Sequence, residues 1–223
     1  MGIFNLFKKQ KDSRNNSEFI HLDTKQMKIF EEFTKKLFGD DYQVMHELVS
    51  PDIHLDVLVF SPTEESNYYT LVTMGMCGYK MNVPKELKDK SLERAELIMH
   101  LPPNWNIKSS KEEDYWPIEQ IKTIARMPIY DKTYLAGWHT VNNGNPVSTN
   151  TESTGFILLP VLNHKLNIKE LGSINFYTLM PLYKEELEYV YENGTNKLMN
   201  LCEENNVPYP PVLDIKRKNL CRK

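Results

Sequence analysis

Residues 53–60 read IHLDVLVF, and every second residue from Ile53 onward is aliphatic. This two-residue period is typical of a β-strand. Two later segments share the strand character: 68–74 is rich in aromatic and β-branched residues, and 95–101 repeats the alternation. The connections between the three segments are too short for most parallel crossovers, so we expect an antiparallel meander.

A helix is expected before these strands. Asp23 and Gln26 match the pattern of a capping box, in which two side chains satisfy the free N–H groups of the first turn. Apolar residues at helical spacing follow, and Gly39 stands where a helix commonly ends. The pattern therefore predicts a helix over 24–38.

Further elements follow the third strand. Pro117 fits the first turn of a helix over 116–127, and Pro128 should end that helix. The remaining expected elements are strands at 155–162 and 174–180 and helices at 183–192 and 195–205. The sequence thus predicts an α/β domain of the α+β type, with a mixed, mostly antiparallel sheet flanked by helices.

Composition narrows the functional classes. The chain has 223 residues, of which 40% are hydrophobic and 26% charged, an ordinary globular profile. No apolar run approaches the length of a membrane-spanning helix, so stable membrane insertion is not expected. The three cysteines are too few and too widely spaced for a disulfide framework or a metal knuckle. We therefore expect a reduced, cytoplasmic protein.

The net charge of −3 is unevenly distributed. We expect a flexible basic leader at 1–18, one domain at 19–211, and a basic tail at 212–223. Residues 1–16 carry four basic and one acidic side chain, and residues 212–223 carry five and one, which leaves 18 basic and 28 acidic between them. That acidic middle suits a basic partner through electrostatic steering. A solvated acidic surface that aids solubility explains it equally well.

Recognised catalytic motifs are absent from the sequence, including nucleophile elbows and phosphate-binding glycine loops. We expect no catalytic residues, no metal and no cofactor. Two alternatives remain open. One is a hydrolase that uses His139 or His100 with a nearby carboxylate, and the other is a regulator that binds nucleic acid through the basic ends of the chain.

Two regions are richer in recognition residues than a simple scaffold requires. Tyrosines and methionines gather at 68–81, and a tryptophan precedes a polar, turn-rich loop at 137–146. Such side chains suit protein interfaces, although they also fill cores. The candidate partner-binding residues are Tyr69, Thr73, Met74, Met76, Tyr79, Trp138, His139 and Asn143.

Six blocks in this order resemble the Suppressor of Fused-like domain family. They are TLVTMGM (70–76), AELI (95–98), LPPNW (101–105), YWPI (115–118), GWHTVNNGNP (137–146) and LMPLYKEEL (179–187). The resemblance covers about residues 27–210 and implies an α/β binding module without known catalysis. The chain resembles the bacterial single-domain type, without the large C-terminal domain of the animal protein.

The resemblance also implies a class of partner. Bacterial members of this family are often immunity proteins, or antitoxins, that neutralise a cognate polymorphic toxin by binding it. Peptide capture in the animal protein involves a second domain, so that mode of binding is not carried over. The expected partner is therefore a protein, namely a toxin domain. That domain is expected to be basic if the acidic middle of the chain is complementary to it.

Overall fold

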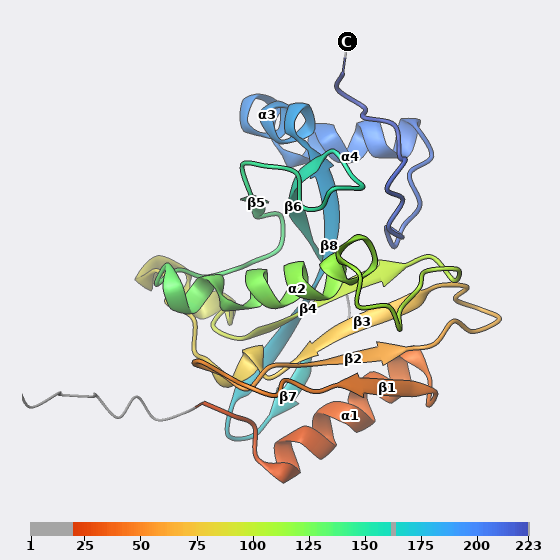
Figure 1. Ribbon diagram of the computed structural model, residues 1–223. Helices are drawn as coiled ribbons and strands as arrows, with labels where there is room; N and C mark the ends of the chain where they lie inside the picture. Colours follow the sequence, from red (N-terminus) through yellow and green to blue (C-terminus); the bar gives the residue numbers. More distant parts are fainter. Residues whose placement is uncertain (1–19, 162–163, 223) are drawn as a thin grey trace, which may run out of the picture.

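The computed structural model describes residues 20–161 and 164–222 (Figure 1). The expected leader at 1–18 lies outside the described residues. The strands are β1 (Tyr42–Met45), β2 (Asp56–Phe60), β3 (Tyr69–Met74), β4 (Ala95–Leu101), β5 (Thr140–Asn142), β6 (Ser153–Pro160), β7 (Leu166–Ile168) and β8 (Gly172–Tyr183). The helices are α1 (Thr24–Phe38), α2 (Glu112–Tyr130), α3 (Lys184–Asn193) and α4 (Thr195–Glu204), with short 3₁₀ turns η1 (Met76–Gly78) and η2 (Lys85–Lys90).

The strands form one mixed sheet in the order β1-β2-β3-β4-β8-β6-β5. The first four strands are an antiparallel meander, as the short connections predict. Among the named strands of the described residues, the one parallel pairing joins β4 to β8, with Ala95 opposite Asn175. The predicted fold class, a mixed and mostly antiparallel sheet flanked by helices, is confirmed.

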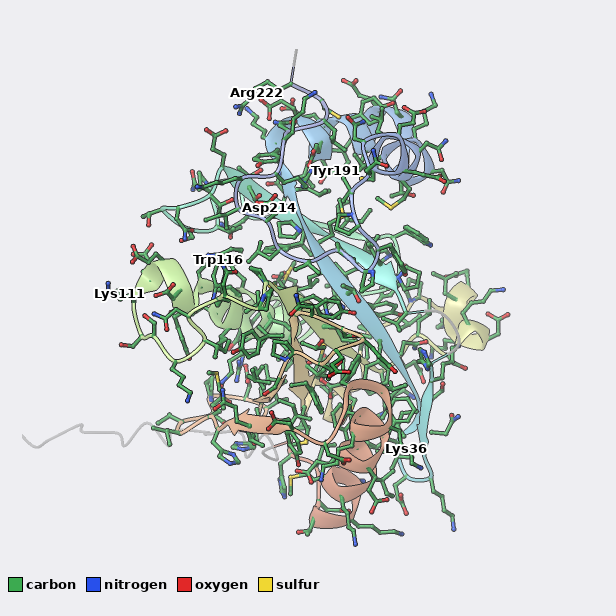
Figure 2. The ribbon with its side chains drawn as sticks, turned by 90° about the vertical axis from the view of Figure 1, so that its right-hand side faces the viewer. Lys36, Lys111, Trp116, Tyr191, Asp214 and Arg222 are labelled. Atoms are coloured by element: carbon green, nitrogen blue, oxygen red, sulfur yellow. The ribbon has the colours of Figure 1, made fainter. Side chains whose placement is uncertain are left out.

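Strand β8 is the longest strand and joins three neighbours. Its first residues pair with β7, its middle pairs with β4, and its second half pairs with β6. Figure 2 shows it running from the end of the molecule near Lys36 to the opposite end, where Tyr191 and Arg222 lie. The α1–α2 part of the molecule and the α3–α4 part are therefore built on one continuous strand.

Helices cover both faces of the sheet (Figure 1). Helix α1 lies on one face, where Phe30 is buried and its ring centroid lies 6.0 Å from that of Phe176. Helix α2 lies on the other face and buries Trp116. Helices α3 and α4 pack against β6 and β8. Leu187 and Leu198 are buried there in a hydrophobic cluster with residues of these two strands.

Helix α1 has the predicted bounds, and its capping box is present, with Asp23 accepting from Gln26 N–H at 2.8 Å. Helix α2 corrects two expectations: it starts at Glu112, so that Pro117 lies in its second turn, and it continues past Pro128 to Tyr130. Pro117 lacks the N–H that would bond to the carbonyl of Glu113. The side-chain amide of Asn150 donates to that carbonyl instead, at 2.8 Å.

The segment after residue 211, expected as a tail outside the domain, packs against the domain as far as residue 222. Val212 forms a parallel bridge with His100, and Leu213 N–H donates to the His100 carbonyl at 2.8 Å. Leu213 itself is buried. These contacts extend the sheet beside β4, where β8 has already turned toward β6.

A buried ion pair fixes the same segment farther along. Both guanidinium Nη atoms of Arg217 bond to the two carboxylate oxygens of Glu186, at 2.6 and 2.7 Å. Glu186 is completely buried and also accepts the N–H groups of Tyr183 and Leu220. The hydroxyl of Tyr183 donates to the carbonyl of Arg217. The last described residues are therefore anchored to the start of α3.

Candidate protein-binding surface

A buried carboxylate holds the turn that follows β3. Glu96 accepts from the Thr73 hydroxyl at 2.6 Å and from the N–H groups of Gly75 and Cys77 at 2.9 and 3.0 Å. Burial raises the pKa of Glu96 to about 7, and these hydrogen bonds oppose that rise. The turn also requires glycine, since Gly75 has φ +127° and a Cβ there would lie 2.0 Å from the carbonyl oxygen of His54.

Three of the expected binding residues belong to this interior corner. Thr73 is 0% exposed, Met76 1% and Met74 5%. Met74 packs in the α1-facing core and Met76 in the α2-facing core. They present almost no surface to a partner in this structure, so their role here is to support the sheet and its turn.

Tyr69 and Tyr79 are half-buried at the edge of the same region. Both pack against the core beneath α2. Tyr79 also lines a hollow of about 700 Å³ with the basic residues Lys85, Lys88 and Lys132. Each tyrosine therefore has one packed side and one side that a partner can reach.

Trp138 is 44% exposed and has a left-handed backbone, with φ +71°. This conformation is unusual for a bulky residue. Backbone hydrogen bonds impose it: Trp138 N–H donates to Leu158 at 2.6 Å, and Leu158 N–H donates to His139 at 2.9 Å. The chain thus holds an indole at the surface in a conformation that costs free energy.

Surfaces beside Trp138 are available to a partner. A hollow of about 600 Å³ lies next to it, lined in part by Pro160, Lys165 and Phe176. The neighbouring His139 is half-buried, its ring edge-to-face with Tyr134 at 4.9 Å, and burial lowers its pKa. Trp138 and His139 are adjacent at the entry to β5.

Asn143 lies beyond the other end of β5, in an exposed hairpin loop. Its side-chain amide donates to the carbonyl of Asn145 at 3.1 Å. The structure therefore does not bring Asn143 together with Trp138.

Sequence reasoning missed an exposed apolar loop between β1 and β2. Leu48 is 95% exposed and Val49 83%. The base of the loop is braced by Arg126, which lies 2.7 Å from Glu47 and 3.0 Å from Asp52. Two adjacent aliphatic residues between polar neighbours were the available signal, but the partner Arg126 is more than 70 positions away in the sequence.

Histidines in this loop contact acidic and hydroxyl groups. Asp56 lies 3.0 Å from His46 and 3.3 Å from His54, and the Ser50 oxygen lies 3.0 Å from His54 Nδ1. The Ser50 hydroxyl also donates to Glu47 at 2.8 Å, and Glu47 pairs with Arg126. These contacts brace the base of the loop.

The hydrolase alternative finds no support at its named histidines. Among residues 20–161 and 164–222, neither His100 nor His139 lies within 4 Å of a carboxylate oxygen. Within the same residues, no group of three histidine, cysteine, aspartate or glutamate side chains is arranged to hold a metal ion. No helix in the described part of the chain is long and apolar enough to cross a bilayer.

The chain is similar to the proteins of one known family. The family model of Suppressor of fused protein (SUFU) matches residues 51–218, which is most of the chain. No curated protein matches the chain in sequence.

Solved structures share the fold at low sequence identity. A Neisseria gonorrhoeae FA 1090 protein described as a SUFU homolog has a TM-score of 0.61 and 15% identity, over 88% of this chain and 95% of that one. A chain from the Sufu–Fu complex has a TM-score of 0.65 and 10% identity, over 86% and 91%. Drosophila Suppressor of Fused has the same TM-score and identity, but the match spans 87% of this chain and 51% of the fly protein. Together with the matched family model, these observations show that the chain belongs to the Suppressor of Fused family.

Proposed function

We propose that this chain is a non-catalytic protein-binding module whose partner contacts Trp138. The observation that carries the proposal is the exposed indole in a strained backbone conformation beside a surface hollow. Large aromatic side chains at interfaces are frequent sources of binding free energy. The Sufu–Fu complex, in which a protein of the same fold is bound to Fu, supports a protein as the class of partner.

The partner we propose is a cognate toxin, which would make the chain an immunity protein. Family membership supports this role, as does the acidic middle of the chain, which suits a basic protein. We place the protein in the cytoplasm, and its three cysteines, all without a disulfide, are compatible with a reducing compartment.

Ion pairs within the chain neutralise part of the positive charge of the C-terminal segment. Arg217 is paired with Glu186, and Arg222 with Glu152 and Glu185, so two of the five basic residues after 211 are engaged by the chain itself. The segment therefore offers less free positive charge than its composition indicates. A basic partner should associate more slowly as salt rises, because exposed charges are screened.

Binding is tested with the protein encoded by the neighbouring gene, using Trp138→Gly. Glycine accepts a positive φ, so this variant removes the indole and relieves the backbone strain at once. We expect it to fold at least as stably as the wild type and to bind about 30-fold more weakly, the equivalent of about 2 kcal/mol. The matched control is Tyr191→Ala, which removes an aromatic side chain that is 65% exposed on α3.

Calorimetric titration measures binding, and a co-expression growth assay measures protection of growth. The two assays therefore test the binding module and the immunity role separately. Wild-type affinity in a folded Trp138→Gly variant would remove Trp138 from the interface. Binding without protection of growth would reject the immunity role and keep the binding module. Absence of any binding to the neighbouring product would reject the toxin as partner.

A further inference from the structure

Another cavity lies between the end of α1 and the C-terminal segment, and it shares Val161 and His164 with the hollow beside Trp138. Its volume is about 290 Å³. Ile98 and His100 of β4 and Thr178 of β8 line it from the sheet, while Phe38, Tyr68 and Tyr209 line it from the flanking segments. This volume is near the lower limit of ligand pockets and suits about one side chain with a ring.

His100 brings an unpartnered polar atom to this cavity. The residue is 4% exposed, and its Nδ1 lies 3.1 Å from the Thr70 hydroxyl. Its Nε2 has no hydrogen-bond partner among the described residues. Burial lowers the pKa of His100 to about 4, so the ring is neutral near pH 7 and Nε2 either donates or accepts one hydrogen bond.

Thr178 offers a second polar group to the cavity. It is 4% exposed and stands opposite Ile98 in the parallel β4–β8 pairing. Its hydroxyl also lacks a hydrogen-bond partner within the described residues. Neither atom is sealed away from solvent, because neither is among the enclosed side-chain atoms without a partner in the described part of the chain. An occupant that carries a polar atom would therefore replace water as the hydrogen-bond partner of these groups.

The walls indicate the shape of that occupant. Tyr68 packs edge-to-face on His100, with ring centroids 4.8 Å apart. Tyr209 is 69% exposed and its hydroxyl donates to the carbonyl of Pro160 at 3.3 Å, so it forms an outer lip. Aromatic rings prefer offset or edge-to-face contacts with other rings, and this arrangement leaves space for one more.

We propose that this cavity receives one aromatic side chain that carries a polar atom, a tyrosine or tryptophan of the protein partner. The ring would pack between Tyr68 and Tyr209, and its hydroxyl or indole N–H would bond to His100 or Thr178. This inference rests on the proposed protein-binding function and adds a second anchor point to it, separate from Trp138.

The test titrates the full chain with N-acetyl-tyrosinamide, N-acetyl-tryptophanamide and N-acetyl-phenylalaninamide, followed by amide chemical shifts. The first two probes should saturate, with shifts centred on His100, Thr178 and Tyr209. The phenylalanine probe should bind at least about fivefold more weakly because it lacks the polar atom, a difference of about 1 kcal/mol.

Three variants complete the test. Thr178→Val keeps the side-chain shape without the hydroxyl, and Tyr209→Ala removes the exposed lip. Each should weaken the tyrosine probe about fivefold or more. Tyr191→Ala, which removes an equally exposed tyrosine on α3, should leave probe binding unchanged.

Several results would overturn the proposal. These are shifts located elsewhere, equal binding of the phenylalanine probe, or unchanged binding by both cavity variants. Free indole bound far more tightly than the amides, below about 10 µM, would indicate a small-molecule site instead. If the partner binds through Trp138 but tolerates Thr178→Val and Tyr209→Ala, the cavity proposal fails and the protein-binding function stands.

Discussion

Glu96 and Glu186 are both completely buried, yet they are satisfied in different ways. Glu186 faces Arg217 with two short charge-assisted hydrogen bonds. The donors to Glu96 are neutral: a threonine hydroxyl, two backbone N–H groups and the Cys77 thiol. One carboxylate therefore stays in a buried pair of opposite charges, while the other holds a turn together without any cation.

The difference shows that two distinct physical means fix two ends of the fold. The Glu186 pair ties a segment that is distant in sequence onto α3, and its strength depends on both partners being present. The Glu96 corner depends on protonation, because its folded pKa of about 7 lies well above the usual value of 4.5.

Arg217→Ala should have the largest effect. Removing the guanidinium leaves the Glu186 carboxylate buried without a cation, and this loss typically costs about 3–5 kcal/mol of stability. The free energy of unfolding from urea denaturation measures it. A loss below about 1 kcal/mol would show that water reaches Glu186 once Arg217 is gone. The double variant Glu186→Leu with Arg217→Met should recover part of the loss, since it leaves no charge unpaired.

Glu96→Gln should change how stability depends on pH. Because the folded pKa of Glu96 is raised from 4.5 to about 7, its protonated form favours the fold, and that stability is lost as pH rises from 4.5 to 7. The unfolding free energy of the wild type relative to Glu96→Gln should fall by roughly 3 kcal/mol over this range. Thermal or urea unfolding at half-unit pH steps measures the difference.

His100 makes stability depend on pH in the opposite direction. The Glu96→Gln variant shows this dependence by itself. Its folded pKa is lowered from 6.5 to about 4, so its contribution is present above pH 6.5 and is lost as pH falls toward 4. In the wild type the two trends overlap between pH 4.5 and 6.5 and partly cancel. Glu96→Gln alone should therefore become more stable as pH rises through that range. A parallel pH profile in both proteins would contradict the assignment to Glu96.

Arg222→Ala should have the smallest effect. Arg222 contacts Glu152 at 2.8 Å and Glu185 at 3.2 Å, but its side chain is half-exposed and its pairs are open to solvent. Exposed ion pairs contribute little to stability. We expect an unfolding midpoint within experimental error of the wild type. A loss comparable to that of Arg217→Ala would mean that the whole C-terminal segment is held at its last residues.

Local patterns predicted most of the sheet and helices. The capping box of Asp23 and Gln26 located the start of α1, and alternation located β2 and β4. The bounds of α2 could not be predicted from Pro117, because the amide that satisfies the freed carbonyl comes from Asn150, in a distant loop. Strands β1, β5 and β7 were missed because all three are short, with four, three and three residues.

The candidate surface was predictable only in part. Trp138 stood out as a tryptophan beside a turn-rich loop, and it is exposed. Thr73 and Met76 had the right residue types, but burial depends on the β3–β4 pairing and on Glu96, which single-sequence patterns do not specify. The same limit applies to Arg217, whose charge suggested a free basic tail while its partner Glu186 lies 31 positions earlier.

The parallel pairing of β4 with β8 has a consequence for synthesis on the ribosome. Ala95 pairs with Asn175, which lies 80 positions later in the sequence. The β1–β4 meander can form early from local contacts, but one edge of β4 stays unpaired until β8 has been translated. Pairings so distant in sequence slow folding, and an open strand edge invites contact with other chains. The emerging chain should therefore depend on chaperones most strongly between the appearance of β4 and that of β8.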